Sequence, residues 1–82
     1  MDTISDSSFI YERVIQLIDL NEYSEAINFI KRNIKTINLD QDIALAYIYC
    51  GFINFRLGDY SSSIRDFSEA IEFEKRFNFL TE

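Results

Sequence analysis

The chain has 82 residues, of which 48% are hydrophobic and 27% are charged, a composition typical of one small globular domain and not of a disordered segment. Its net charge of −6 disfavours binding to nucleic acid or to an anionic membrane surface, because both attractions depend on basic side chains. Proline and histidine are absent and glycine occurs twice, which favours long helices and removes the commonest catalytic base and metal ligand.

The first half of the chain predicts two helices after a polar start. Residues 1–6 are expected to form a disordered tail, and they lack the basic and apolar regions of a signal peptide. A first helix is expected from about Ser7 to Leu20, and Asn21, which tolerates a left-handed conformation, can end it. A second helix is expected from about Glu22 to Thr36 or Ile37. The apolar positions of these helices recur at spacings of three and four: Ile10, Tyr11, Val14, Ile15, Leu17 and Ile18, then Tyr23, Ala26, Ile27, Ile30, Ile34 and Ile37.

The second half predicts two further helices. Asp40 is the expected N-cap of a helix over about Gln41 to Leu57, which is apolar on nearly every side. Gly58 fits the left-handed residue that ends this helix, and Asp59 fits the next N-cap. A fourth helix begins at Tyr60 and is expected to face the core with Ile64, Phe67 and Ile71.

Membrane insertion is not expected from this pattern. The longest uncharged run, Ile43 to Phe55, is shorter than the roughly 20 residues that a membrane-spanning helix needs. The single cysteine, Cys50, excludes a disulfide framework and suits a reducing compartment. We therefore expect a soluble, cytoplasmic protein.

An internal repeat links the two halves. The stretch Asn21-Glu22-Tyr23-Ser24 is matched 37 residues later by Gly58-Asp59-Tyr60-Ser61, and Ile27 is matched in the same way by Ile64. Repeats with a period of about 20 to 50 residues are typical of stacked helical or mixed units.

The second unit, residues 44–77, resembles a tetratricopeptide repeat (TPR) along the roughly 34 residues of that repeat. The positions that carry the resemblance are Tyr47, Cys50, Gly51, Gly58, Tyr60, Phe67 and Ala70. Asn54 and Lys75 depart from it, because an aromatic residue and a proline are usual there. The first unit, residues 7–40, matches at Tyr23 and Ala26 but lacks both glycines.

The resemblance implies an all-α fold, with two antiparallel helix-turn-helix hairpins stacked as a short TPR-like superhelix. Residues 78–82 would extend the last helix beyond the second repeat. An unrelated four-helix bundle is the alternative.

Catalysis is not expected. Without histidine, Cys50 has no activating base, and its position on an apolar helix favours a buried hydrophobic role. Two glycines are too few for a phosphate-binding loop, and the acidic pair Asp40 and Asp42 lacks the glycine and the final glutamate of a calcium loop. We expect no enzyme, cofactor, metal ion or small-molecule substrate.

The TPR resemblance implies that a partner binds in a concave groove lined by the first helix of each repeat. In this chain the groove positions are Tyr11, Ile15, Ile18, Ile48, Phe52, Phe55 and Arg56. Most of these side chains are large and apolar, and together they exceed the apolar patch that monomers usually leave open. The expected ligand is therefore a hydrophobic or amphipathic segment of another polypeptide.

A second apolar surface is expected at the C-terminal end, where Phe73, Phe77 and Leu80 follow helical spacing. Two repeats without a polar capping helix are few for a stacked architecture. Three explanations remain open: a second copy of the chain covers the groove and the last helix, the last helix folds back over the groove, or the chain is part of a longer array.

Overall fold

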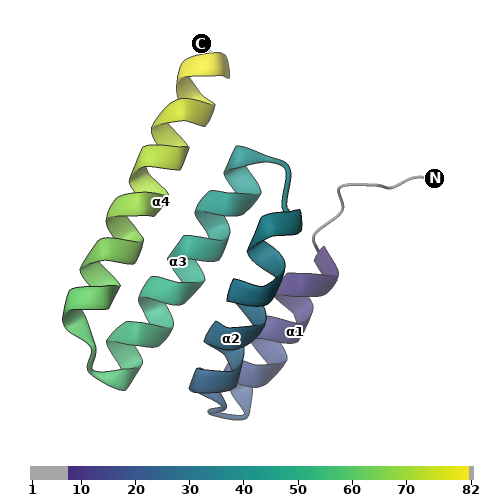
Figure 1. Ribbon diagram of the computed structural model, residues 1–82, viewed down its shortest axis with the longest axis vertical. Coiled ribbons are helices and arrows are strands. Elements are labelled where there is room, and N and C mark those ends of the chain that lie inside the picture. The colour runs from purple at the N-terminus through teal and green to yellow at the C-terminus, as the bar shows by residue number, and fades with distance from the viewer. Residues whose placement is uncertain (1–7, 82) are drawn as a thin grey trace.

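The computed structural model describes the backbone of residues 8–81 and the side chains of residues 8–76. This part of the chain contains α1 (Ser8–Asp19), α2 (Tyr23–Asn33), a short 3₁₀ turn (Ile34–Thr36), α3 (Asp40–Leu57) and α4 (Tyr60–Thr81). Consecutive helices run antiparallel, and α3 lies between α4 and the pair formed by α1 and α2 (Figure 1). The prediction of an all-α fold made of two helical hairpins is confirmed. The predicted tail, residues 1–6, lies outside the described residues.

Both hairpins turn through the same backbone arrangement. Asn21, with φ of 60°, and Gly58, with φ of 84°, adopt the left-handed conformation, as the sequence predicts. The amide of Glu22 then donates to the Leu17 carbonyl at 2.8 Å, and the amide of Asp59 donates to the Asn54 carbonyl at 2.9 Å. Each of these hydrogen bonds runs from the residue after the left-handed residue back to a carbonyl in the last turn of the helix, which the helix itself leaves without a partner. The left-handed residue therefore ends the helix.

The start of α4 is capped as predicted, whereas the start of α3 is not. An Asp59 carboxylate oxygen accepts a hydrogen bond from the Ser62 amide at 3.2 Å. At α3 the capping position falls on Leu39, whose side chain makes no such bond, and Asp40 is the first helical residue. Asp40 therefore acts as a negative charge in the first turn, where the helix dipole favours it.

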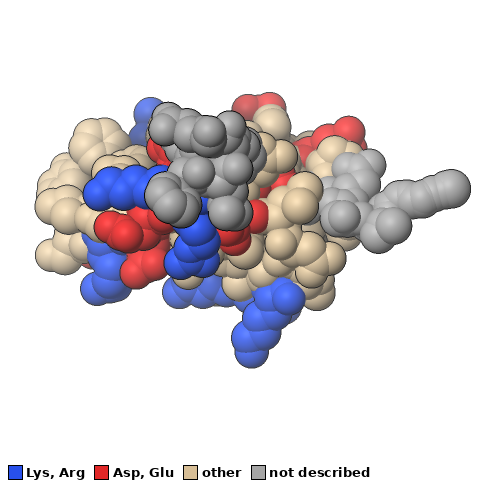
Figure 2. All heavy atoms as spheres, turned by 90° about the horizontal axis from the view of Figure 1, so that it is seen from above, with Lys and Arg blue, Asp and Glu red and all other residues tan. Residues whose placement is uncertain are grey.

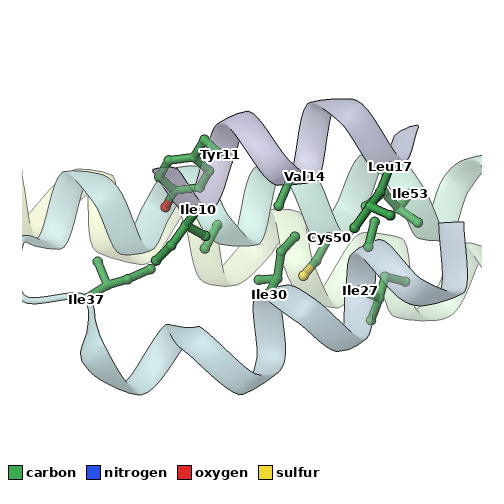
Figure 3. Packing of buried hydrophobic residues seen from close by; sticks show 11 residues of the cluster. Ile10, Tyr11, Val14, Leu17, Ile27, Ile30, Ile37, Cys50 and Ile53 are labelled. Atoms are coloured by element: carbon green, nitrogen blue, oxygen red, sulfur yellow. The ribbon is translucent and has the colours of Figure 1, made fainter. Parts of the chain in front are cut away.

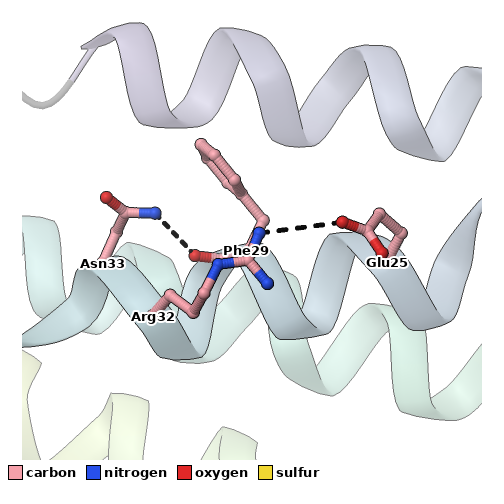
Figure 4. Close-up of polar contacts among 4 residues, drawn as sticks. All are labelled: Glu25, Phe29, Arg32 and Asn33. Atoms are coloured by element: carbon pink, nitrogen blue, oxygen red, sulfur yellow. Dashed lines mark hydrogen bonds and ion pairs between the residues drawn. The ribbon is translucent and has the colours of Figure 1, made fainter.

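The second helix ends earlier than the apolar pattern predicts. The Asn33 side chain donates to the Phe29 carbonyl at 2.8 Å, and the chain tightens into the 3₁₀ turn directly afterwards (Figure 4). An exposed ion pair joins Glu25 and Arg32 at 3.7 Å on the same helix. Ile37, which the pattern assigns to the helix, is buried in the loop beyond the 3₁₀ turn.

The core lies between α1, α2 and α3 (Figure 3). The largest fully buried side chains are Val14 and Ile53 at 0% exposure, Ile30 at 1% and Ile10 at 2%. Cys50 lies in the same cluster. Because α3 closes the space between the first two helices, this core needs residues from both hairpins.

A seam of small residues joins α3 to α4. Ala44 and Gly51 of α3 are buried, and so are Ser63 and Ala70 of α4. The Ser63 hydroxyl donates to the Gly51 carbonyl at 2.9 Å. Small side chains at these positions let the two helices approach closely.

Candidate interaction surface

An exposed apolar stripe runs along α4. Tyr60, Ile64, Phe67 and Ile71 repeat at spacings of four, three and four, so they share one side of the helix. Their exposures are 60%, 67%, 39% and 51%. The prediction that this stripe faces the core is therefore wrong for Ile64 and Ile71, whereas the ring of Phe67 packs on Gly51 of α3. The side of α4 that meets α3 carries the small residues Ser63 and Ala70 together with this ring.

A second exposed stripe runs along α3. Ile48, Phe52 and Phe55 are exposed to 43%, 40% and 55%. They are accessible, as the proposed role in binding requires, and Arg56 lies next to them with its guanidinium 5.8 Å from the centre of the Phe52 ring. The guanidinium is also 6.0 Å from the centre of the Tyr23 ring, which anchors it to the start of α2.

The two stripes form one surface. The rings of Phe55 and Tyr60 lie 5.5 Å apart across the turn between the helices. Further along, the Phe67 ring covers Gly51 so closely that a Cβ atom at Gly51 would lie 2.8 Å from it. We call this surface the α3/α4 face and define it by seven residues: Ile48, Phe52, Phe55, Tyr60, Ile64, Phe67 and Ile71.

The predicted groove does not extend over α1 as the sequence suggests. Tyr11 is 8% exposed, its ring stacks on Tyr49 at 5.5 Å, and its hydroxyl donates to the Asp42 carbonyl. Ile18 is half-buried, and Ile15 is exposed. The assignment of Tyr11 as a partner-binding residue is wrong because α3 packs against this side of α1.

The repeat shows what would cover the α3/α4 face. Six of its positions have equivalents 37 residues earlier, in the first hairpin, that are buried or half-buried, and all six belong to the core shared with α3 or pack against it. In the first hairpin these are Tyr11, Ile18, Tyr23, Ile27, Ile30 and Ile34. The α3/α4 face is thus the equivalent of a surface that, in the first hairpin, is occupied by an apolar helix.

The opposite end of the molecule lacks such a surface. The side of α3 that packs on the first hairpin carries Ala46, Cys50 and Ile53, all buried. The equivalent positions of α1, again 37 residues earlier, are Phe9, Arg13 and Gln16, all exposed. Arg13 and Gln16 therefore place a charge and an amide on α1 where α3 has the buried Cys50 and Ile53, whereas Phe9 is an exposed apolar side chain.

The second predicted surface, at the C-terminal end, is partly occupied. Phe73 is half-buried and stacks on Tyr47 at 5.8 Å, and the Arg76 guanidinium covers it at 4.7 Å. Arg76 also approaches Asp40 of α3 at 4.0 Å. Phe73 is therefore partly covered within the chain, and its role as an oligomer contact stays a prediction. Phe77 and Leu80 lie outside the residues whose side chains are described.

A groove of about 300 Å³ lies between α2, α3 and α4, away from the α3/α4 face. Lys31 and Arg65 line it together with Asp59 and Asp66, so its charges balance. The Asn54 amide donates to the Asp66 carboxylate at 2.7 Å, which ties α3 to α4 here. Cys50 also lines the groove, and burial raises the pKa of its thiol to about 11.

The side chains that line this groove do not form an evident catalytic or metal-binding site. A thiol with so high a pKa is almost wholly protonated at neutral pH and is a poor nucleophile. Among the described residues, no three or more cysteine, aspartate or glutamate side chains gather where they could hold a metal ion. The apolar α3/α4 face is therefore the candidate site.

The fold and this surface define a class: a pair of antiparallel helical hairpins that share a core and leave one broad apolar face open. No model of a known protein family matches the chain, and neither a curated protein nor a solved structure is significantly similar to it. Within the described part of the chain, none of the helices combines the length and the apolar character needed to cross a membrane.

Proposed function

We propose that the chain is a non-catalytic protein-interaction module of the tetratricopeptide kind, which binds a hydrophobic or amphipathic segment of a polypeptide on its α3/α4 face. The observation that supports this most directly is the exposure of seven large apolar side chains on one face. Covering such side chains stabilises a complex by about 1.5–3 kcal/mol each before ordering costs. The alternative is a homo-oligomerisation module whose apolar face is covered by a second copy.

The repeat supports an α-helix as the bound segment. The equivalent face of the first hairpin is covered by α3 through Ala46, Cys50 and Ile53, which lie four and three residues apart. A helix with small and branched side chains at this spacing has the shape that the α3/α4 face would accept. The net charge of −6 favours a basic helix over an acidic one.

The remaining parts of the proposal concern what the chain does not bind and where it works. Nucleic acid, small molecules, metal ions and cofactors are not its ligands in this proposal, and it works in the cytoplasm without entering the membrane. The composition supports this, because histidine is absent and basic residues are outnumbered 14 to 8 by acidic ones. A single free cysteine suits a reducing compartment.

Replacing Phe52 with Asp tests the proposed function. Phe52 is 40% exposed, so we expect the helical circular dichroism signal to be retained. The probe is a labelled synthetic helix with alanine and isoleucine at the α3 spacing and lysine elsewhere, and its binding is followed by fluorescence anisotropy. We expect saturable binding to the unchanged protein and a loss of about tenfold or more in the variant, since a buried carboxylate is costly.

The matched control is Phe9→Asp, on the outer side of α1, where Phe9 is 61% exposed. This change adds the same charge and should leave peptide binding unaltered. The proposed site is refuted if a peptide of the same composition in scrambled order binds as tightly as the designed helix. It is also refuted if Phe52→Asp and Phe9→Asp lose the same amount of binding. Loss of helicity in Phe52→Asp would show that Phe52 supports the core.

A further inference from the structure

The α3/α4 face is larger than the apolar patches that monomers usually leave open. Its side chains are exposed by 39–67%. Taking roughly 200 Å² for each large side chain, about 700 Å² of apolar surface is uncovered, against about 300–600 Å² for the largest patch of a typical monomer. A standard interface buries about 800 Å² on each partner, so this face alone nearly suffices for a stable dimer.

The face is also compatible with a copy of itself. All seven of its side chains are uncharged, and two serines, Ser61 and Ser68, flank the α4 stripe. Two such faces can therefore meet without placing like charges opposite each other at these seven positions, and Arg56, beside Phe52, stands at the edge of the α3 stripe. Figure 2 shows an uncharged zone at the left edge of the molecule, on the side where α4 lies in Figure 1, while acidic and basic side chains mix nearer the centre.

The side of α1 that carries Phe9, Arg13 and Gln16 disfavours a head-to-tail arrangement of copies. In such a chain of molecules, α1 of one copy would take the place that α3 takes on the first hairpin. Arg13 and Gln16 would then enter the apolar position of Cys50 and Ile53. Burying an unpaired guanidinium is strongly unfavourable. An arrangement that uses the α3/α4 face on both partners avoids this cost and closes after two copies.

We propose that the occupant of the α3/α4 face is a second copy of this chain, in a two-fold symmetric dimer in which α3 and α4 of each copy pack on α3 and α4 of the other. This rests on the proposed function in one respect, that the face binds a polypeptide. It goes further in naming the partner and the symmetry. Ile64, at 67% the most exposed residue of the face, lies near its centre, between Phe55 and Tyr60 at one end and Ile71 at the other.

Sedimentation equilibrium of the full chain over a wide range of concentrations tests the dimer. We expect a reversible monomer–dimer equilibrium with no larger species. Ile64→Lys should weaken it by about 100-fold or more, because the two-fold axis brings one lysine from each copy into the interface. Phe9→Lys, the matched control on α1, should leave the equilibrium unchanged. Helicity measured on the same samples shows that both variants are folded.

Cross-linking tests the symmetry. With a cysteine at position 64 (Ile64→Cys), mild oxidation should join two copies through this residue, since a residue near a two-fold axis meets its own counterpart. Oxidation of the Phe9→Cys variant should give no such dimer. A mixture of the two variants should give no cross-link between positions 9 and 64, which would form only in a head-to-tail contact.

Three results would overturn the dimer. One is a monomer at every concentration; if that monomer still binds the synthetic helix, the proposed function survives and only the self-association fails. If it binds neither the helix nor itself, both proposals fail. Species that grow beyond two copies, or a dimer that Phe9→Lys dissolves and Ile64→Lys does not, would place the contact elsewhere.

Discussion

Cys50 is the residue whose chemistry is most altered by the fold. It is 6% exposed among apolar side chains, and burial raises the pKa of its thiol to about 11 from an ordinary value of 9.0. In the unfolded chain the thiol ionises near its ordinary pKa, whereas in the folded chain it stays protonated. The free energy that this difference contributes to stability is complete below about pH 9 and is lost as the pH rises towards 11.

We therefore expect the urea midpoint of the protein to fall as the pH rises from about 9 towards 11, with Cys50→Ala showing a flatter profile. Burial also raises the pKa of Tyr11, but an ordinary tyrosine titrates near 10.0, so its effect begins at higher pH. Chemical denaturation at several pH values checks this. Identical slopes for both proteins would show that the thiol ionises alike in the folded and unfolded states.

At the scale of the elements, the two hairpin turns offer a direct comparison. Gly58 and Asn21 hold equivalent positions with φ of 84° and 60°. Replacing Gly58 with Ala should destabilise the protein by about 1–2 kcal/mol, because a side chain disfavours the left-handed conformation. Gly58→Asn should cost less, since asparagine tolerates that conformation and holds it at position 21. Thermal unfolding of the two variants checks the order, and an equal cost would contradict the role of φ.

Much of the helical layout could be predicted because it depends on local signals. Asn21, Gly58 and Asp59 mark the ends of helices through backbone conformation and capping, which act within a few residues. The end of α2 could not be predicted, because the apolar pattern continues past Asn33 to Ile37 although the helix does not. There the side-chain bond from Asn33 and the 3₁₀ turn determine the boundary.

The orientation of α4 could not be predicted from periodicity. A helical stripe shows that Ile64, Phe67 and Ile71 share one side, but not whether that side faces a neighbour or water. The available signal was the small pair Ser63 and Ala70, which marks the side of close approach to α3. For Tyr11 the missing information was tertiary, because only the packing of α3 on α1 buries it.

At the scale of the whole molecule, the outer side of α1 carries Arg13 and Gln16 beside the exposed Phe9, whereas the opposite end presents the apolar α3/α4 face. Replacing three residues of α1 should remove this asymmetry. The triple variant Phe9→Ala, Arg13→Ala and Gln16→Ile gives α1 small and branched apolar side chains, like those on the buried side of α3. We expect the triple variant to form species larger than a dimer, because α1 can then pack on the α3/α4 face of another copy.

Light scattering over a range of concentrations measures this growth. Adding Ile64→Lys to the triple variant should abolish it, since the face that accepts α1 is then charged. A triple variant with the same mass as the unchanged protein would show that the polar groups of α1 do not limit association.

The position of α3 has a consequence for how binding would be detected. One side of this helix completes the core of the first hairpin through Ile53 and Cys50, and another side carries Ile48, Phe52 and Phe55 on the open face. Any occupant that holds α3 in place also slows the opening motions that expose the backbone of α1 and α2. Amide hydrogens of the first hairpin, which no occupant of that face would touch, should exchange with solvent more slowly once it is occupied.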